Sequence, residues 1–525
     1  MSHCKKIPSS WILQNLSFMI AGKVLLLVSV LNAAEKLPIM IWSDVPDTSI
    51  LRVGETYYMS STTMHLSPGL PVMVSKDLVN WKIASYAHQN LAETDELNLE
   101  NGKNAYGKGT WASSLRFHNG IFYLSTFSLS TGKTYVFTTR DPEKEAWKEA
   151  SFSPLLHDSS LFFEDDGRVY MFHGSHNIRL TELSEDARSI KPGGVDEVVI
   201  PNASYVAGTN IGLRAEGTQV FKINGKYYVF GITWPRDGMR TAILFRSDNL
   251  RGPYEGRIVF QDAGIAQGGI FDTPDGKWYA VLFQDAGAVG RIPYLLPVRW
   301  EEDFPVIGDN GRLPHSFSLP GEPPRIPAIV TSDSFDDSSL SLVWQWNHNP
   351  DPRCWSLSDR KGCLRLSSGR TVRCLTEAKN ILTQRTFGPN CFGKTTIDVS
   401  NLKNGDYSGL VALQKEYAFI GVKKEKEALA IVVVKNQKNH EVEEIAIPLE
   451  QARVHLKLSM DFQDRRDLVS FSYSLDGKEW ISLGTPMKMN YTLPHFMGYR
   501  FGLFHFATQE VGGYTDFEDF LTGFI

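Results

Sequence analysis

The sequence has little cysteine, no strong charge of one sign and no long apolar run. Only 5 of its 525 residues are cysteine, which is too few for a disulfide scaffold. The formal net charge is −5, and this argues against a basic surface that binds nucleic acid. No apolar run approaches the ~20 residues of a membrane-spanning helix. These absences leave a globular protein with no nucleic-acid partner and no membrane span.

Four of the cysteines fall in one β-rich segment: Cys354, Cys363, Cys374 and Cys391. Tetrahedral zinc sites favour paired C-x₂₋₄-C spacing, which these residues lack, and no histidine cluster accompanies them. We therefore expect free or casually paired thiols, and the question of one disulfide stays open. We predict no metal and no cofactor.

The amino terminus has the pattern of a secretion signal. Lys23 precedes the apolar residues 24–31, and the small residues Ala33 and Ala34 follow. A charge, a short apolar run and small residues are typical of a signal peptide. The sequence predicts a signal peptide over residues 1–34, with Met19 as a candidate start, and a secreted or periplasmic mature protein that begins near Glu35.

Aromatic residues and glycine are abundant instead, and they recur in one hairpin pattern. Asn-Gly or Asp-Gly pairs, the dipeptides of tight hairpins, and in the first copy a Val-Gly pair, precede runs of aromatic and β-branched residues that favour strands. The turn glycines are spaced 47 to 66 residues apart, a period that fits one four-stranded propeller blade; they are Gly54, Gly120, Gly167, Gly225 and Gly276. Residues 35–319 are thus predicted to form a five-bladed β-propeller, with an irregular β-rich domain as the alternative.

A second domain follows a proline-rich segment. Residues 320–330 contain Pro320, Pro323, Pro324 and Pro327, which is typical of a linker. Residues 331–525 show alternating strands and no helical periodicity of useful length, so we expect a β-sandwich. The whole fold is predicted to be all-β.

Polar residues stand at similar offsets before the turn glycines, where the innermost strand of each blade should begin. They are Asp47, Trp111, Asp158, Glu216 and Gln267. Inner strands line the propeller axis, so these side chains should converge at one mouth of the channel. Clustered carboxylates repel one another, and two of them can serve as the acid and base of glycoside hydrolysis. The alternative is that each acid only makes local hydrogen bonds at a strand start.

The segments around these residues resemble glycoside hydrolase family 43. The resemblance rests on residues 46–54, 111–120, 157–162, 214–217 and 267–274. The tail, residues 498–504, resembles the concanavalin-like sandwich, a jelly roll, of the β-xylosidase-type members. The resemblance covers most of the mature chain.

The resemblance implies an inverting mechanism. Asp47 would be the general base, Glu216 the general acid, and Asp158 the residue that orients Glu216 and tunes its pKa. Trp111, Gln267 and Arg291 would bind substrate. Asp44 is a rival base. Thr48 and Ala266 depart from the family pattern; members often have a histidine beside a central ion where this chain has Ala266.

The function expected from this resemblance is exo-acting hydrolysis of terminal pentoses, β-D-xylosyl or α-L-arabinofuranosyl, from plant cell-wall glycans. The carbohydrate partners would be fragments of xylan, arabinoxylan, arabinan or xyloglucan. The alternatives are a non-catalytic glycan-binding propeller and a structural interaction propeller. The aromatic segment 499–506 could present a ring to the propeller mouth or form a core strand of the sandwich.

Overall fold

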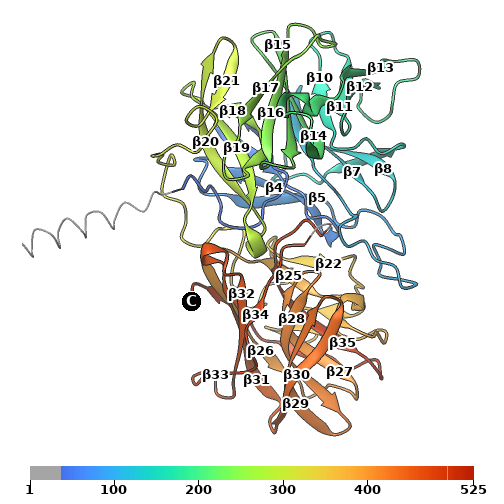
Figure 1. Cartoon of the computed structure of the whole chain (residues 1–525). Coiled ribbons are helices and arrows are strands. Elements are labelled where there is room, and N and C mark those ends of the chain that lie inside the picture. The colour runs from blue at the N-terminus through green and yellow to red at the C-terminus, as the bar shows by residue number, and fades with distance from the viewer. Residues whose placement is uncertain (1–36, 493–494) are drawn as a thin grey trace, which may run out of the picture.

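The computed structural model describes residues 37–492 and 495–525, so the expected signal peptide lies outside the described residues. Within this part of the chain, strands dominate and the helical segments are short 3₁₀ turns. Figure 1 shows a propeller, coloured blue to yellow-green, above a sandwich coloured yellow to red.

Five four-stranded antiparallel sheets form the propeller, and each is built from strands in chain order, with β3 left out of the first. The first two blades are β1 (Ser49–Val53), β2 (Thr56–Ser60), β4 (Gly69–Ser75) and β5 (Lys82–His88), then β6 (Ser114–His118), β7 (Ile121–Ser128), β8 (Lys133–Thr139) and β9 (Lys148–Phe152). The third is β10 (Ser160–Phe163), β11 (Val169–His173), β12 (Ile178–Leu183) and β13 (Asp196–Ile200). The last two are β14 (Ile211–Ile223), β15 (Lys226–Pro235), β16 (Thr241–Ser247) and β17 (Glu255–Phe260), then β18 (Ala266–Asp272), β19 (Trp278–Asp285), β20 (Arg291–Glu301) and β21 (Phe304–Ile307).

The predicted turn glycines join the first and second strands of each blade. All five have positive φ, between 58° and 85°, as tight hairpin turns require. The innermost strands β1, β6, β10, β14 and β18 contact one another in a closed ring. The five-bladed propeller is therefore confirmed.

The inner strands do not begin where the sequence predicted. Strands β1 and β10 begin two residues after Asp47 and Asp158, which have φ values of 50° and 45°. A left-handed residue interrupts the regular ladder, and in these two blades the strand starts beyond it. Strand β6 begins three residues after Trp111, whereas Glu216 lies inside β14, between two register shifts. Gln267 is the second residue of β18, one position from its predicted start. The other four predicted strand starts were wrong, although the residues still share one end of the propeller.

The sandwich consists of one eight-stranded and one nine-stranded sheet. The first contains β3 (Leu66–Ser67), β22 (Gln345–Asn347), β25 (Leu382–Arg385), β35 (Arg500–Ala507), β27 (Asp406–Leu413), β28 (Tyr417–Glu425), β29 (Ala428–Gln437) and β30 (His440–Leu449). The second contains β23 (Trp355–Ser356), β24 (Leu364–Ser367), β36 (Tyr514–Phe517), β26 (Asn390–Asp398), β31 (Arg453–Asp461), β32 (Leu468–Ser474) and β33 (Ile481–Ser482), with β34 (Met487–Lys488) and β37 (Leu521–Gly523) at its side.

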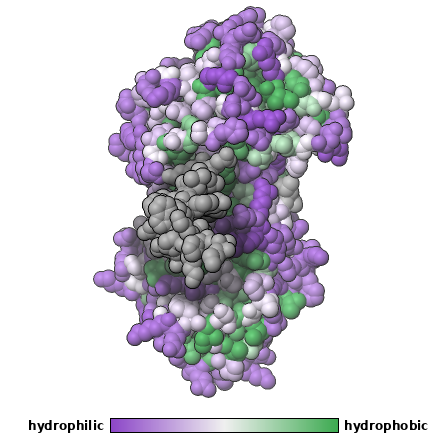
Figure 2. Space-filling model, turned by 60° about the vertical axis from the view of Figure 1, so that its left-hand side comes forward, coloured by the Kyte–Doolittle hydropathy of each residue, from purple (hydrophilic) through white to green (hydrophobic). Residues whose placement is uncertain are grey.

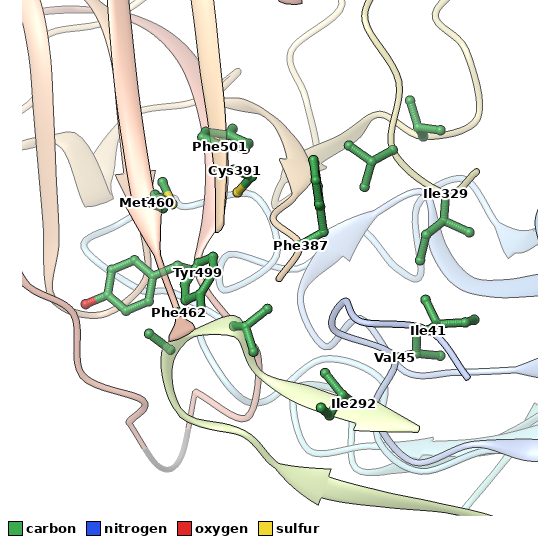
Figure 3. Close-up of a cluster of buried hydrophobic side chains, with 14 of the residues drawn as sticks. Ile41, Val45, Ile292, Ile329, Phe387, Cys391, Met460, Phe462, Tyr499 and Phe501 are labelled. Carbon is green, nitrogen blue, oxygen red and sulfur yellow. The ribbon is translucent and has the colours of Figure 1, made fainter. Parts of the chain in front are cut away.

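The two domains share backbone pairing and a hydrophobic core. Strand β3, which lies between two strands of the first blade, pairs with β22 of the sandwich. Figure 3 shows one buried cluster in which Ile41 and Ile292 of the propeller approach Phe387 and Tyr499 of the sandwich. Because this surface is withdrawn from water in both domains, its burial stabilises their relative position.

The structure also shows the state of the cysteines, the length of the helices and the polarity of the surface. Cys354, Cys363, Cys374 and Cys391 are free thiols, so the question of a disulfide among them is closed. No helix of the described residues is long and apolar enough to cross a membrane. The face shown in Figure 2 is largely hydrophilic over both lobes, with apolar residues in small groups.

Candidate active site

A cavity of about 530 Å³ opens at the propeller end that carries the clustered acids. All six residues predicted from the sequence line it: Asp47, Trp111, Asp158, Glu216, Gln267 and Arg291. The sandwich contributes Phe496 to the same wall. The structure therefore brings five blades and both domains together at one site.

The base side of the cavity is a buried ion-pair network. Arg291, the first residue of β20, donates from Nη1 to Asp47 Oδ1 at 2.8 Å, and both side chains are 6% exposed. The Nε of Arg291 donates to Asp285 Oδ1 at 3.0 Å, and Arg240 pairs with the other oxygen of Asp285 at 2.8 Å. Burial raises the pKa of Asp47, while Arg291 and Arg240 oppose that rise. The network thus holds one carboxylate in a fixed position under low hydration.

Asp44, the rival base, has a different place. Its Oδ1 accepts a hydrogen bond from the backbone N–H of Arg291 at 2.7 Å, and it does not line the cavity. A Cβ at Gly290, which has φ of 100°, would lie 2.1 Å from that oxygen, so only glycine permits this contact. Asp44 is part of the scaffold that supports Arg291, and the geometry favours Asp47 as the group that faces substrate.

The acid side of the cavity is more open. Glu216 is 24% exposed and its Oε2 lies 3.1 Å from Nε2 of His157, which is 30% exposed. The same nitrogen lies 3.7 Å from Oδ2 of Asp158, which is only 6% exposed. The backbone N–H of Gly217 donates to that Asp158 oxygen at 2.8 Å. Asp158 is therefore anchored beside Glu216, as the role of orienting the acid requires.

Electrostatics couple these three groups. Burial raises the pKa of Asp158, and the nearby charges of Glu216 and Asp47 raise it further, although His157 opposes them. Burial alone would lower the pKa of His157, but Asp158 and Glu216 outweigh it and the pKa is raised. The cluster consequently retains a proton at a pH where an isolated aspartate would have lost it.

Close packing of Gly217 against Gln267 fixes the backbone on the acid side of the cavity. Gly217 has φ of 72°, and a Cβ there would meet the Gln267 side chain at 2.9 Å. Gln267 itself has φ of 59°, a conformation that costs energy for a residue with a side chain. Asp47, Asp158 and Gln267 thus all carry positive φ at the cavity, which is typical of backbone held at a functional site.

Aromatic side chains form the remaining wall. The ring centroid of Trp111 lies 5.0 Å from that of Phe496 and 5.6 Å from that of Phe127. The Nε1 of Trp111 is buried and meets no acceptor among the described residues. Trp234, 40% exposed, adds a second indole at the rim. Flat apolar faces with a few polar groups are what sugar rings contact.

The segment 499–506 is a core strand and not a lid. Tyr499 and every residue of β35 are buried in the sandwich, which agrees with the simpler of the two sequence expectations. The ring at the cavity comes instead from Phe496, three residues before Tyr499. Sequence reasoning also gave no role to His157, Arg240 and Asp285. His157 is adjacent to a predicted acid, and that adjacency was the one available signal.

The same acid-side cluster is the one group of described residues with three potential metal-ligand atoms in proximity. The atoms of His157, Asp158 and Glu216 lie within 4.8 Å of one another. His157 and Glu216 are joined by a hydrogen bond. Asp158 accepts a hydrogen bond from the backbone N–H of Gly217. The described residues thus place one candidate ligand cluster beside the expected general acid.

A propeller that gathers carboxylates in such different environments around a sugar-sized pocket defines a carbohydrate-cleaving enzyme, a glycoside hydrolase. The chain belongs to glycosyl hydrolases family 43, whose family model matches residues 38–305. The model of the beta xylosidase C-terminal concanavalin A-like domain matches residues 332–521.

Individual relatives agree with this family. A beta-xylosidase of Formosa agariphila is 27% identical, with 91% of this chain and 88% of that protein covered. A non-reducing end alpha-L-arabinofuranosidase of Bacteroides ovatus is 27% identical over 70% of this chain and 71% of its own length. The solved bifunctional GH43-CE structure of Bacteroides eggerthii is 54% identical with a TM-score of 0.91. That match covers 94% of this chain, which spans 64% of that protein.

Proposed function

We propose that this hydrolase removes single terminal pentose units from plant cell-wall oligosaccharides with inversion at the anomeric carbon. The observation that carries the proposal is the contrast between two carboxylates at one cavity. Asp47 is locked against Arg291, whereas Glu216 is exposed beside His157. A fixed base and a proton-carrying acid on opposite sides of a glycosidic bond are the requirements of single displacement.

In the proposed mechanism Asp47 takes a proton from a water molecule as that water attacks the anomeric carbon. Glu216 gives its proton to the departing glycosidic oxygen, so one C–O bond forms while another breaks. Asp158 helps to position Glu216 because it accepts a hydrogen bond from the backbone N–H of the next residue, Gly217. Arg291 orients Asp47, and Trp111, Gln267 and Phe496 contact the sugar.

Exo action is supported by the aromatic side chain that the sandwich adds to the cavity wall. Phe496 of the sandwich packs against Trp111 at 5.0 Å between ring centroids. The guanidinium carbon of Arg291 lies 5.3 Å from the centroid of the Phe496 ring. A wall shared by both domains would leave room for one terminal sugar and would block a continuing chain.

The pentose preference is supported by the relatives, which include proteins named for β-xylosidase and for α-L-arabinofuranosidase activity. Xylan, arabinoxylan, arabinan and xyloglucan fragments are the corresponding substrates. The sequence of residues 1–34 supports an extracytoplasmic location, which cell fractionation of the native host would test. The non-catalytic alternative is not favoured, because all three acids are present at the cavity.

The deciding experiment is hydrolysis of aryl β-D-xyloside and aryl α-L-arabinofuranoside by the full chain, followed early by proton NMR. We expect one or both to be cleaved, with the inverted anomer appearing first. The Asp47 and Glu216 carboxyl groups should stand ~6.5–9.5 Å apart to admit the water. A retained anomer would refute the inverting assignment, and no cleavage of either compound would refute the pentose assignment.

A further inference from the structure

Two arginines face each other beneath the propeller, on the sandwich sheet that meets it. Arg385 is the last residue of β25 and Arg500 the first of β35, and they are direct partners in the antiparallel register. Directly opposed residues project from the same face, and like charges in such a pair are destabilising. Both side chains are buried, with 1% and 3% of their surface exposed. Two positive charges are therefore held side by side away from water.

Their hydrogen bonds are incomplete. Arg385 Nε donates to the backbone oxygen of Asp44 at 2.9 Å. Arg500 donates from Nε to Thr383 Oγ1 and from Nη2 to Gln345 Oε1, each at 3.0 Å. Both Nη atoms of Arg385 and Nη1 of Arg500 are buried and have no acceptor in full hydrogen-bond geometry among the described residues, although the Tyr86 hydroxyl lies within bonding reach of Arg385. Buried donors without a partner are costly, so such groups in folded proteins normally meet a water molecule or an ion.

The surrounding charge does not balance the two arginines. Asp44 is the carboxylate that acts on Arg500, and it also acts on Arg385. Its Oδ1 already accepts the N–H of Arg291, and burial raises its pKa to about 6. The neutral hydroxyl of Tyr86, which also interacts with both guanidinium groups, donates to the backbone oxygen of Leu342 at 2.7 Å. At least one buried positive charge is left uncompensated, which is expensive in a low-dielectric interior.

We propose that the domain interface binds a small monovalent anion of the chloride class between Arg385 and Arg500. The free guanidinium N–H groups of both residues would donate to it. The ion would have to be small because the three nitrogens are buried. A single negative charge fits because, together with Asp44, it balances two arginines. The proposal concerns stability of the interface and does not depend on the proposed substrate.

The site would also connect the interface to the catalytic cavity. Asp44 faces the arginine pair through its backbone oxygen and Arg291 through its side chain. Arg291 in turn holds Asp47. An anion that fixes the arginine pair would therefore support the segment on which the base side is built.

The first test measures the Tm of the full chain while sodium chloride replaces sodium gluconate at constant ionic strength. Gluconate is the reference because this anion is too large to enter the site between the two arginines. A ligand bound by the folded state stabilises it saturably, and we expect the Tm to rise by about 2–3 °C at roughly 100 times the Kd. Identical unfolding curves in gluconate and chloride would overturn the proposal and assign the free N–H groups to water.

The variant Arg500→Met removes one of the two charges, and the chloride response should vanish with it. The matched control is Arg365→Met, which removes a sandwich arginine that pairs with Asp516 and should leave the chloride response intact. Should Arg500→Met fail to fold, native crystals soaked in sodium bromide decide the question. An anomalous peak at hydrogen-bonding distance from both guanidinium groups supports the site, and a map without that peak overturns it.

Discussion

The two sides of the catalytic cavity are held in opposite ways. On the base side, Asp47 and Arg291 are each 6% exposed and belong to a chain of ion pairs that continues to Asp285. On the acid side, Glu216 is 24% exposed and its hydrogen-bond partner is His157, a residue that can itself gain or lose a proton. A base needs a fixed water, whereas an acid must be reprotonated from solvent in every turnover. The comparison indicates that rigidity and access are divided between the two carboxylates.

The most severe test of this comparison is Asp47→Asn. Loss of the general base should lower kcat/KM by about 10⁴-fold, the upper end for general base catalysis, because Asp285, the other carboxylate beside Arg291, does not line the cavity. The loss should be equal for poor and good leaving groups, since both need an activated water. Steady-state kinetics on a natural oligosaccharide and an activated aryl glycoside measure it. A loss confined to one substrate would contradict the assignment.

Glu216→Gln should lower the rates on the two kinds of substrate by different factors. The rate on oligosaccharides should fall by about 10²–10³-fold, because the leaving oxygen then departs without protonation. Activated aryl glycosides, which need little protonation, should lose far less. The ratio of the two losses, compared with the ratio for Asp47→Asn, separates the acid from the base. An unchanged rate on oligosaccharides would exclude Glu216 as the acid.

Arg291→Met tests the electrostatic lock by its effect on pH dependence. The positive charge of Arg291 opposes the rise in the pKa of Asp47, so its removal should raise that pKa further. Asp47 acts as a base only when ionised, so the acidic limb of kcat/KM should move to higher pH by about 1 unit or more. Arg240→Met should move the limb in the same direction but less, since Arg240 has the weaker effect.

Circular dichroism and Tm of both variants show whether the fold survives, because removal of one partner of a buried pair is itself destabilising. A uniform loss of activity at every pH, with an unmoved limb, would show that Arg291 only supports the structure.

Phe496→Ala gives the smallest expected effect and asks what the sandwich adds to the cavity. The ring should contribute about 0.5–1.5 kcal/mol to sugar binding, so KM should rise by roughly 2–10-fold while kcat stays unchanged. Val511→Ala, an exposed position of the same domain, is the matched control. A fall in kcat with an unchanged KM would mean that Phe496 acts through Arg291, whose guanidinium lies over its ring.

These contrasts also show how far the sequence could lead. The five glycine hairpins, four of them Asn-Gly or Asp-Gly, predicted the blade number because the turn geometry is local and each glycine has the positive φ that the turn requires. Offsets from those turns placed Asp47, Asp158 and Glu216 at one end of the propeller, and the structure brings them to one cavity. The offsets failed for the strand starts, because left-handed backbone and register shifts are not visible in a hydrophobic pattern.

The sequence by itself determined the all-β fold, the two-domain order and the identity of the clustered acids, since short-range turn and strand preferences specify them. Only the tertiary structure decided that Phe496 and not the strand after Tyr499 reaches the cavity, and that His157 rather than a neighbouring carboxylate bonds to Glu216. It also decided that Arg385 and Arg500 lie opposite each other. Phe496 reaches the cavity because the two domains pack together. The His157–Glu216 contact depends on how neighbouring blades pack, and the Arg385–Arg500 pair depends on the pairing of two strands that are far apart in the sequence.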